Sequence, residues 1–299
     1  MNILRYFVIF LIVIMADQVQ SQVKGSLKLA MAQMLVEGGK KDNNLNRAVE
    51  RIEEAAKNNA DIILLPEAMD LGWTHSSAKT EAEPIPAGET FKILAKAAKK
   101  NNIYVCAGII EKDDDRTFNA AVLINRKGEL ILKHRKVNEL DIAHDLYDQG
   151  DRINVCETEF GTIGVLICAD ANAKDYMLTR SMGYLGADLI LLPSSWAVES
   201  DHDNKKDPYG GMWENAFSTV CKEFNLSIAS VSNVGEITDG PWENWLCIGN
   251  SIFVGNGAKK LSILPYGAVA DTIVYQEIEL QHRPGRGTSW GKYWSKLKN

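Results

Sequence analysis

Cys168 combines a reactive side chain with a position that indicates chemistry. It ends an apolar run that begins at Ile163, and Ala169 and Asp170 follow it. A run of β-branched and aliphatic residues that closes on a small or polar group is typical of a buried strand. A thiol at such a strand end faces a turn, where a nucleophile can meet a substrate. The alternative is that Cys168 is a small buried hydrophobic residue, as most free cysteines are.

Two ionisable residues also lie just past predicted strands. Glu67 follows Pro66 and the apolar segment 61–65, and Lys136 closes the basic cluster 134–136 after the segment 129–133. Burial at the rim of a sheet raises the pKa of a carboxyl and makes it a usable base near neutral pH. The structural alternatives are a helix cap or ion-pair partner for Glu67, and a solvated edge for the basic cluster.

The segments that must position these residues alternate between strands and helices. Helices are predicted where apolar residues recur on one face, with Asn43 as the cap of the first. Turns at 113–116 and 125–128 join three successive strands, which predicts an antiparallel part of the sheet. The pattern is typical of an α/β domain with a mixed sheet. The predicted helices are 43–56, 88–100, 175–185 and 212–224, and the predicted strands are 27–33, 61–65, 103–110, 118–124, 129–133, 163–168, 187–192, 226–232, 251–254 and 274–280.

The composition is that of a globular protein with a sizeable core. The chain has 299 residues, of which 45% are hydrophobic and 24% charged, with a formal net charge of −6. Nucleic acid or an anionic membrane surface would require a clustered basic face, so a small molecule is the expected partner. The five cysteines are an odd set without short paired spacing, which indicates neither a disulfide framework nor a zinc site.

The first residues have the layout of a secretory signal. Arg5 precedes the apolar run 6–16, and the polar segment 17–21 follows with small residues at plausible cleavage positions. We therefore expect residues 1–21 to be a signal peptide that exports the chain, and residues 22–299 to form the functional domain. The apolar run is shorter than the ~20 residues that span a bilayer, so stable membrane insertion is not expected. A membrane anchor made by the same segment is the alternative.

The order Glu67, Lys136, Cys168 and the segments around these residues resemble the nitrilase superfamily of carbon-nitrogen hydrolases, whose members share a Glu-Lys-Cys triad. The resemblance covers nearly everything after the predicted signal, and shorter motifs occur in the same order: Ala30-Met31-Ala32-Gln33, Gly186-Ala187-Asp188, Ser232-Asn233-Val234-Gly235 and Gly249-Asn250-Ser251. The resemblance implies a four-layer α-β-β-α sandwich with mixed sheets. It also implies a homodimer, or a higher homo-oligomer, and a site without metal or organic cofactor.

The same resemblance implies a role for each triad residue. Cys168 would form a thioester, and Glu67 would act as general base and then acid. Lys136 would lower the pKa of the thiol and stabilise the oxyanion, with the backbone N–H of Ala169 as a second oxyanion donor.

The sequence departs from the common family pattern around the substrate. Ala169 stands where an aromatic residue is frequent and Asn172 where arginine is frequent; these two residues and Trp196 are expected to contact the substrate. Many members carry a second glutamate after the lysine, and the spacing to Gly150 places Asp145 there, with Glu139 as the alternative.

The expected function is hydrolysis of a small amide or carbamoyl compound. Nitrile hydrolysis is the alternative within the family. It ranks lower because nitrilases usually show Trp-Glu directly after the cysteine, whereas this chain has Ala169-Asp170. A catalytically silent binding or assembly module of the same fold is an alternative of another class, and an N-acyltransferase is a third. The long polar segment 197–211 is a candidate rim of the site.

Overall fold

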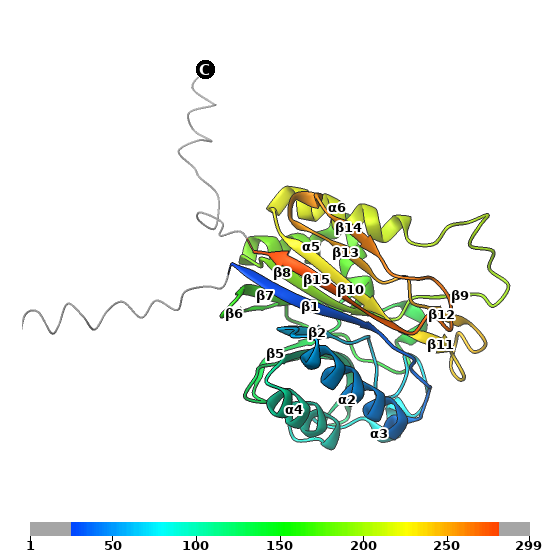
Figure 1. Ribbon diagram of the computed structural model, residues 1–299. Coiled ribbons are helices and arrows are strands. Elements are labelled where there is room, and N and C mark those ends of the chain that lie inside the picture. The colour runs from blue at the N-terminus through cyan, green and yellow to red at the C-terminus, as the bar shows by residue number, and fades with distance from the viewer. Residues whose placement is uncertain (1–24, 281–299) are drawn as a thin grey trace, which may run out of the picture.

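Two large β-sheets form the centre of the computed structural model, which describes residues 25–280 (Figure 1). The first sheet has the strand order β15-β1-β2-β3-β4-β5. β1, β2 and β3 pair in parallel, whereas β15, β4 and β5 join antiparallel, so the sheet is mixed as predicted. Its strands are β1 (Ser26–Gln33), β2 (Ile62–Leu64), β3 (Tyr104–Asp113), β4 (Arg116–Ile124), β5 (Leu130–Arg135) and β15 (Thr272–Glu279).

The second large sheet is also mixed and has the order β14-β13-β10-β8-β7-β6. A small third sheet has the order β11-β12-β9. The strands of the second sheet are β6 (Val155–Thr158), β7 (Gly161–Val165), β8 (Leu189–Ser194), β10 (Ser227–Ser232), β13 (Ile252–Val254) and β14 (Leu261–Ile263); those of the small sheet are β9 (Ala197–Val198), β11 (Val234–Glu236) and β12 (Leu246–Ile248).

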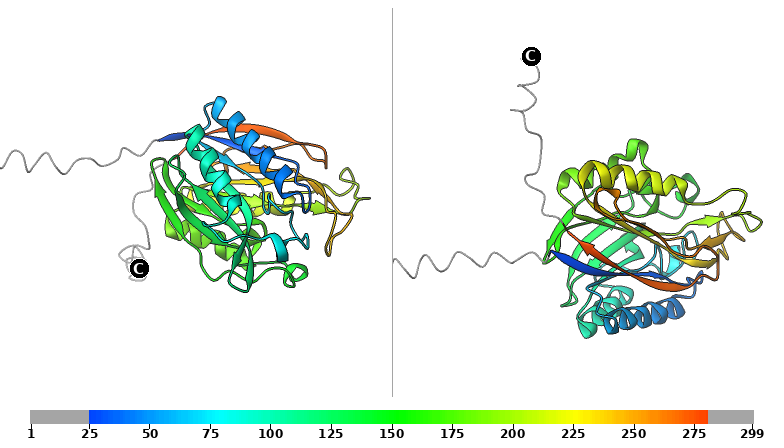
Figure 2. Two further views of the ribbon diagram at one scale, coloured as in Figure 1. Left: turned by 90° about the horizontal axis from the view of Figure 1, so that it is seen from below. Right: turned by 45° about the horizontal axis from the view of Figure 1, so that its top comes forward.

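Helices cover the outer face of each large sheet (Figures 1 and 2). The α-helices are α2 (Lys41–Lys57), α3 (Ala78–Glu81), α4 (Glu89–Asn101), α5 (Met177–Leu185) and α6 (Gly211–Phe224); the 3-10 helices are η1 (Asp141–Ala143), η2 (Cys168–Asn172), η3 (Lys174–Tyr176) and η4 (Asn256–Ala258). α2 and α4 lie on the first sheet, and α5 and α6 lie on the second. The predicted four-layer α-β-β-α sandwich is therefore confirmed. Within residues 25–280, no helix combines the length and the apolar character that a membrane span requires.

The alternation of side chains along β1 explains the layers. Leu29 and Met31 belong to the apolar core between the two sheets, whereas Ala30 and Ala32 belong to the core beneath α2 and α4. Successive residues of a strand point to opposite faces, so a central strand buried on both sides is apolar throughout.

The first helix begins two residues earlier than predicted. α2 starts at Lys41, so Asn43 lies inside the helix and is not its cap. The neighbouring Asn44 instead binds the chain before the helix, because its Oδ1 accepts the N–H of Glu37 and its Nδ2 donates to the Glu37 carbonyl. These two bonds hold the connection between β1 and α2 against the helix.

Candidate active site

Glu67 projects from the turn that follows β2. Its backbone N–H donates to the carbonyl of Ser194 at the end of β8, which joins the two sheets at this point. Gly108 of β3 passes so close that a Cβ there would lie 2.5 Å from the Cα of Glu67 and 2.8 Å from the Pro66 carbonyl oxygen. A glycine at 108 is what allows Glu67 to sit this deep, with only 1% of its side chain exposed.

Lys136 follows β5 directly and is held between two carboxylates. Its Nζ lies 2.8 Å from Oε1 of Glu67 and 2.9 Å from Oε1 of Glu139, and only 2% of the side chain is exposed. The amide of Asn119 on β4 donates to both carboxylates, at 2.7 Å to Glu67 and 3.2 Å to Glu139. A buried charge needs partners of this kind, and here two carboxylates contact one ammonium while Asn119 binds both carboxylates.

Cys168 lies three residues past the end of β7, at the start of η2. Its φ of +42° is unusual for a residue with a Cβ and costs about 1–3 kcal/mol, which is the kind of strain found at functional sites. The thiol is 7% exposed, and the backbone N–H of Ser195 is directed at its sulfur. The strand thus ends in a sharp turn that presents the sulfur to the space near Glu67 and Lys136.

Asp170 connects the cysteine turn to the loop that carries Lys136. Its Oδ2 accepts the N–H of Ile167 at 3.0 Å and faces Nε2 of His134 at 2.7 Å, and its Oδ1 accepts the N–H groups of Val137 and Asn138. Asp170 and His134 are both fully buried. This carboxylate fixes the two segments relative to each other.

The electrostatics of the cluster follow from burial and from its three charges. Burial raises the pKa of Glu67, and the charge of Glu139 adds to this while Lys136 opposes it. Burial lowers the pKa of Lys136, but the charges of Glu67 and Glu139 outweigh burial and hold the pKa well above its ordinary value. Lys136 is therefore an ammonium at neutral pH.

The pKa of the Cys168 thiol is raised as well. Burial is the largest cause and the charge of Glu67 adds to it, while Lys136 and the Ser195 N–H lower the pKa. The expectation that Lys136 lowers this pKa describes one contribution, but the sum has the opposite sign because the sulfur is desolvated. In the absence of a substrate, the Cys168 thiol is thus protonated and lies near the Glu67 carboxyl.

Glu67 offers one oxygen to that thiol. Its Oε1 accepts hydrogen bonds from Lys136 and Asn119, whereas its Oε2 is buried and has no hydrogen-bond partner among residues 25–280. A buried acceptor without a partner costs free energy, about 1–3 kcal/mol, unless a ligand or water completes it. The arrangement supplies a base, a cation and a nucleophile around one small space.

Comparison with known proteins agrees with this geometry. The family model for carbon-nitrogen hydrolases matches residues 28–281. The chain belongs to the carbon-nitrogen hydrolase family. An omega-amidase of Danio rerio is 30% identical over 265 residues, which cover 85% of this chain and 89% of that protein. A nitrilase of Pyrococcus abyssi is 32% identical over 173 residues, or 56% of this chain and 65% of that one.

Solved structures of this family share the fold. A carbon-nitrogen hydrolase from Helicobacter pylori aligns with a TM-score of 0.73 at 20% identity, covering 85% of this chain and 90% of that one. The Nit3 protein of Saccharomyces cerevisiae, a member of the nitrilase superfamily, aligns with a TM-score of 0.70 at 22% identity and covers 86% and 91%. The matches to the first curated relatives are shorter, and span 54% to 65% of those proteins' own length.

In this family member, the structure separates the two candidates for the second carboxylate. Glu139 contacts Lys136 through Oε1, and its own chain holds it because the same oxygen accepts the N–H of Leu140 at 3.0 Å. Asp145 lies exposed on the loop after η1. The geometry therefore favours Glu139, the alternative, over Asp145.

The three predicted substrate contacts have different environments. Ala169 is buried, and its carbonyl accepts the side-chain amide of Asn138 at 2.7 Å. Asn172 is half-buried with Nδ2 unpartnered. Trp196 is 1% exposed and stacks on Trp213 at 4.8 Å, so its ring is part of the core, although its Nε1 has no partner.

Sequence reasoning missed Asn119 and Ser195. Asn119 is a buried amide within the otherwise apolar part of β4, and a polar side chain in such a strand is a signal that was present in the sequence. Ser195 follows the strand end at Ser194, but nothing in the local sequence shows that its N–H points at Cys168.

Aromatic side chains form one wall next to this cluster. The ring centroid of Trp73 lies 5.7 Å from Nζ of Lys136. Trp73 meets Trp242 edge to face at 5.0 Å, and Trp242 stacks on Trp245 at 4.3 Å. Trp73 also lines a narrow cleft with a cavity volume of about 10 Å³, together with Asn233 and Cys247.

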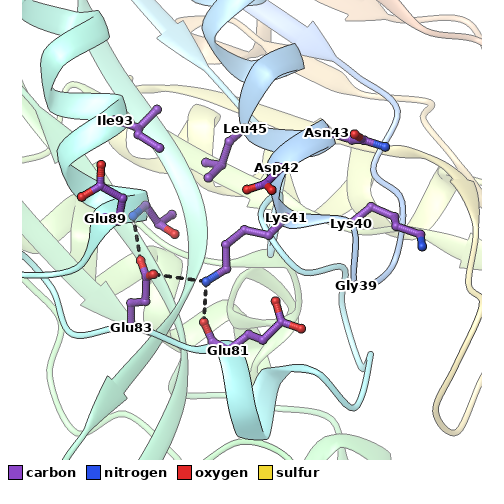
Figure 3. Close-up of a pocket in the computed structure, with 11 residues that line it drawn as sticks. Gly39, Lys40, Lys41, Asp42, Asn43, Leu45, Glu81, Glu83, Glu89 and Ile93 are labelled. Atoms are coloured by element: carbon purple, nitrogen blue, oxygen red, sulfur yellow. Dashed lines mark hydrogen bonds and ion pairs between the residues drawn. The ribbon is translucent and has the colours of Figure 1, made fainter.

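A separate cavity of about 500 Å³ lies between the starts of α2 and α4 (Figure 3). Within it, Lys41 donates to Oε1 of Glu83 at 3.2 Å and to the carbonyl of Glu81 at 2.7 Å. Its lining residues include no member of the Glu67, Lys136 and Cys168 cluster. The larger space is therefore not where the proposed chemistry occurs.

Proposed function

We propose that the chain hydrolyses a non-peptide carbon-nitrogen bond of a small amide or carbamoyl compound through a thioester on Cys168. The observation that carries the proposal is that the two carboxylate oxygens of Glu67 have different environments. One carboxylate oxygen is fixed by Lys136 and Asn119, and the other is buried, unpartnered and close enough to affect the thiol. Named relatives that are amidases, omega-amidases and nitrilases support this reaction class.

The first half-reaction moves one proton from Cys168 to Glu67. As the thiol proton passes to the Glu67 carboxylate, the sulfur attacks the amide carbon, and the carbonyl oxygen becomes an oxyanion. The Lys136 ammonium and the N–H of Ser195 are the donors for that oxyanion. Glu67 then returns the proton to the nitrogen, the carbon-nitrogen bond breaks, and ammonia or an amine leaves a thioester on Cys168.

Water completes the cycle by the same route. Glu67 takes a proton from the water as its oxygen attacks the thioester carbon. The tetrahedral intermediate collapses, the carbon-sulfur bond breaks, and the proton on Glu67 returns to the sulfur. A raised pKa suits Glu67 to both directions of transfer, because a base is most effective when its pKa lies near the working pH.

The assisting carboxylate in this proposal is that of Glu139. It binds the Lys136 ammonium as a second carboxylate and raises the pKa of Glu67 by its negative charge. Glu139 is therefore a positioning residue.

Mass spectrometry with small amides tests the proposal. Wild-type protein incubated with an accepted amide should release ammonia and carry a transient acyl mass on Cys168, whereas Cys168→Ala should show neither. Cys156→Ser is the matched control, because that half-buried thiol lies on β6 away from Glu67 and its loss should leave turnover unchanged. Ammonia release from nitriles but not from amides would instead favour the nitrilase alternative, and turnover by Cys168→Ala would exclude the thioester.

We also propose a homodimer that forms through the outer helical layer. Met177, Tyr184 and Leu185 of α5 and Met212 of α6 are exposed, which leaves apolar side chains on a face that no other described segment covers. Light scattering after size exclusion should show a dimer for wild type and a monomer for Tyr184→Glu. Leu261→Glu, at an exposed apolar position on the edge strand β14 and not on a helix, should remain dimeric.

A further inference from the structure

A second thiol lies near the nucleophile, on the small sheet. Cys247 is the central residue of β12, is 3% exposed, and pairs with Ala197 of β9. β9 begins two residues after Ser195, so this pairing brings Cys247 next to the segment that faces the nucleophile. Ser195 contacts both thiols, because its N–H is directed at the sulfur of Cys168 and its Oγ lies 3.6 Å from the sulfur of Cys247. The two sulfurs are therefore neighbours of one residue.

The electrostatic environment also places the two thiols together. Burial is the largest cause of the raised pKa of Cys168 and of Cys247, and the charge of Glu67 adds to it at both. Burial likewise raises the pKa of the Tyr209 hydroxyl, and the charges of Cys168 and Cys247 both add to that shift. Interactions between charges weaken with distance, so Glu67 and Tyr209 each lie within range of both sulfurs.

Hydrogen-bond donors hold the sulfur of Cys247. Burial raises the pKa of Cys247 to about 11, and hydrogen bonds from the Ser195 hydroxyl and the Asn233 side chain oppose this. Donors of this kind stabilise a thiolate, which is the form of cysteine that attacks another sulfur. A cysteine that only fills space in a core needs no such donors.

The other three cysteines have different surroundings. Cys221 lies on α6, and its thiol donates to the carbonyl of Val254 at 3.6 Å. Cys106 on β3 belongs to the core between the two large sheets, and Cys156 on the edge strand β6 packs against that core. Among the cysteines of residues 25–280, Cys168 and Cys247 are thus the pair that Ser195 connects.

The nucleophile can react with an oxidant as well as with an amide. The Cys168 thiol is 7% exposed, and hydrogen peroxide is smaller than any amide substrate. When Glu67 takes the thiol proton, the thiolate can attack an oxygen of the peroxide. The O–O bond breaks, the sulfur becomes a sulfenic acid, and the second oxygen leaves as water with the thiol proton. A second peroxide would convert this sulfenic acid irreversibly to sulfinic acid.

From these contacts we infer that Cys247 is a resolving thiol, which forms a disulfide with Cys168 once hydrogen peroxide has oxidised Cys168 to the sulfenic acid. The sulfur of Cys247 attacks the sulfenic sulfur, the sulfur-oxygen bond breaks, and the hydroxyl leaves as water with the Cys247 proton. Two thiols are oxidised to one disulfide, and one peroxide is reduced to two water molecules.

The disulfide makes the loss of activity reversible. Cys168 cannot attack an amide while it is bonded to Cys247, but it is also protected from further oxidation. Thiol reductants restore both thiols by exchange through a mixed disulfide. The sulfurs meet by rotation about the χ1 bonds of the two cysteines, and the hydrogen bond from Ser195 to Cys247 is broken. The inference rests on the proposed function only for the activity that is switched off.

Peptide mass spectrometry of the oxidised full-length protein tests the inference. Wild type that is treated with hydrogen peroxide and then alkylated in denaturant without reductant should show two fewer free thiols. Its digest should contain a peptide pair joined through Cys168 and Cys247. Ammonia release from an accepted amide should fall as this disulfide forms, and dithiothreitol should restore most of it. A sulfinic acid on Cys168 with Cys247 still free, or a disulfide from Cys168 to another cysteine, overturns the inference.

The variant Cys247→Ser assigns the protection to this thiol. Serine keeps the shape of the side chain but cannot form a disulfide. After peroxide, the variant should regain a several-fold smaller share of its own untreated activity in dithiothreitol than wild type does, and sulfinic and sulfonic acids should accumulate on Cys168. Cys156→Ser is the matched control, because it removes a half-buried thiol on β6, and it should recover as wild type does. Equal recovery in a folded Cys247→Ser variant overturns the inference; if that variant does not fold, the wild-type peptide pair decides.

The peptide pair keeps the inference independent of the proposed reaction. A disulfide between Cys168 and Cys247 in a wild type that hydrolyses none of the amides supports the inference and rejects the proposed function alone. A wild type that hydrolyses amides but keeps Cys247 free after peroxide supports the proposed function and overturns the inference. In Cys168→Ala, peroxide should leave Cys247 free, because no sulfenic acid forms beside it; oxidation of Cys247 there would overturn the assigned roles.

Discussion

Replacing Glu139 by glutamine removes one charge from the buried cluster and changes little else. The amide keeps the volume of the carboxyl, and its oxygen can still accept from Lys136 and from the N–H of Leu140 at the position of Oε1. Its nitrogen then takes the place of Oε2. In the wild type, that oxygen accepts a hydrogen bond from the side-chain amide of Asn119 at 3.2 Å. Two donors face each other there, so the bond from Asn119 is lost.

The size of the effect follows from the interactions that are removed. A hydrogen bond to a charged group contributes about 1.5–3 kcal/mol, which corresponds to a factor of about 10 to 150 in rate if it is needed in the transition state. Asn119 also positions Glu67, so its displacement affects the base as well as the ammonium. We expect kcat/KM of Glu139→Gln to fall by about 10- to 100-fold while the protein remains folded.

The direction in which the pH profile moves distinguishes the loss of the Glu139 charge from a general loss of stability. Glu67 must be ionised to accept the thiol proton, so activity falls as the pH drops through its raised pKa. Glu139 raises that pKa by like-charge repulsion. Removing its charge lowers the pKa, and the acidic limb of the rate profile should move to lower pH.

Another buried carboxyl also titrates in the working range and must be distinguished from Glu67. Burial raises the pKa of Asp70 to about 7, although backbone N–H groups including that of Ile110 oppose this. The largest causes of the shift at Asp70 are burial and backbone N–H groups and do not include Glu139, whereas Glu139 is among the largest at Glu67, so a displaced limb in Glu139→Gln is assigned to Glu67.

Ammonia release measured from pH 5 to pH 9 is the assay, with Asp145→Asn as the matched control. Asp145 is exposed, and its neutral variant should keep wild-type rates and the wild-type profile. A larger loss in Asp145→Asn than in Glu139→Gln, or an acidic limb that stays in place or moves to higher pH in Glu139→Gln, would refute the assignment of Glu139.

Three further predictions concern the frame around the site and the chain's first residues. Gly108→Ala should destabilise the fold by about 1–3 kcal/mol and lower kcat, because its Cβ would meet backbone atoms at Glu67; urea unfolding measures this against Gly211→Ala, where a Cβ meets nothing within 4 Å. Asp170→Asn should cost about 3–5 kcal/mol at neutral pH, since it leaves buried donors without their carboxylate. Burial opposes the ionised form of Asp170, but its hydrogen bonds lower the pKa overall, so its contribution is present above pH ~4 and is lost as the pH falls through that lowered pKa; the difference between wild type and variant should shrink there. We propose that residues 1–21, which lie outside the described residues, direct export; Edman sequencing of the mature protein should start near residue 22, and a start at Met1 in the cytoplasmic fraction would contradict this.

The sequence was a good guide to the fold where hydrophobic patterns are long. Helices α2, α4 and α6 and the strands around them lie within a few residues of their predicted ranges, because one buried face imposes a strong period. The short strands β9, β11, β12 and β14 were not predicted. They have two or three residues each, and tertiary pairing with their neighbours determines them more than any pattern of their own.

The site was predictable to the extent that each residue follows a strand. Glu67 and Lys136 follow strands of the first sheet and Cys168 follows β7 of the second, and this position past a strand brought all three into consideration before any contact was known. The choice between Glu139 and Asp145 depends instead on how the loop after β5 turns. That turn is fixed by contacts distant in sequence: Asp170 binds the N–H groups of Val137 and Asn138.

The same contacts explain why a glutamate three residues from Lys136 can serve the site. In an extended segment, a residue three positions on points away from its neighbour, so its carboxylate cannot reach the same ammonium. Asp170 binds two consecutive N–H groups and turns the chain immediately after the lysine, and the carboxylate of Glu139 then returns to within 2.9 Å of Nζ. The acid two residues past the cysteine therefore shapes the loop that supplies the assisting carboxylate. Loss of Asp170 should remove catalysis by displacing Glu139 and Lys136 together.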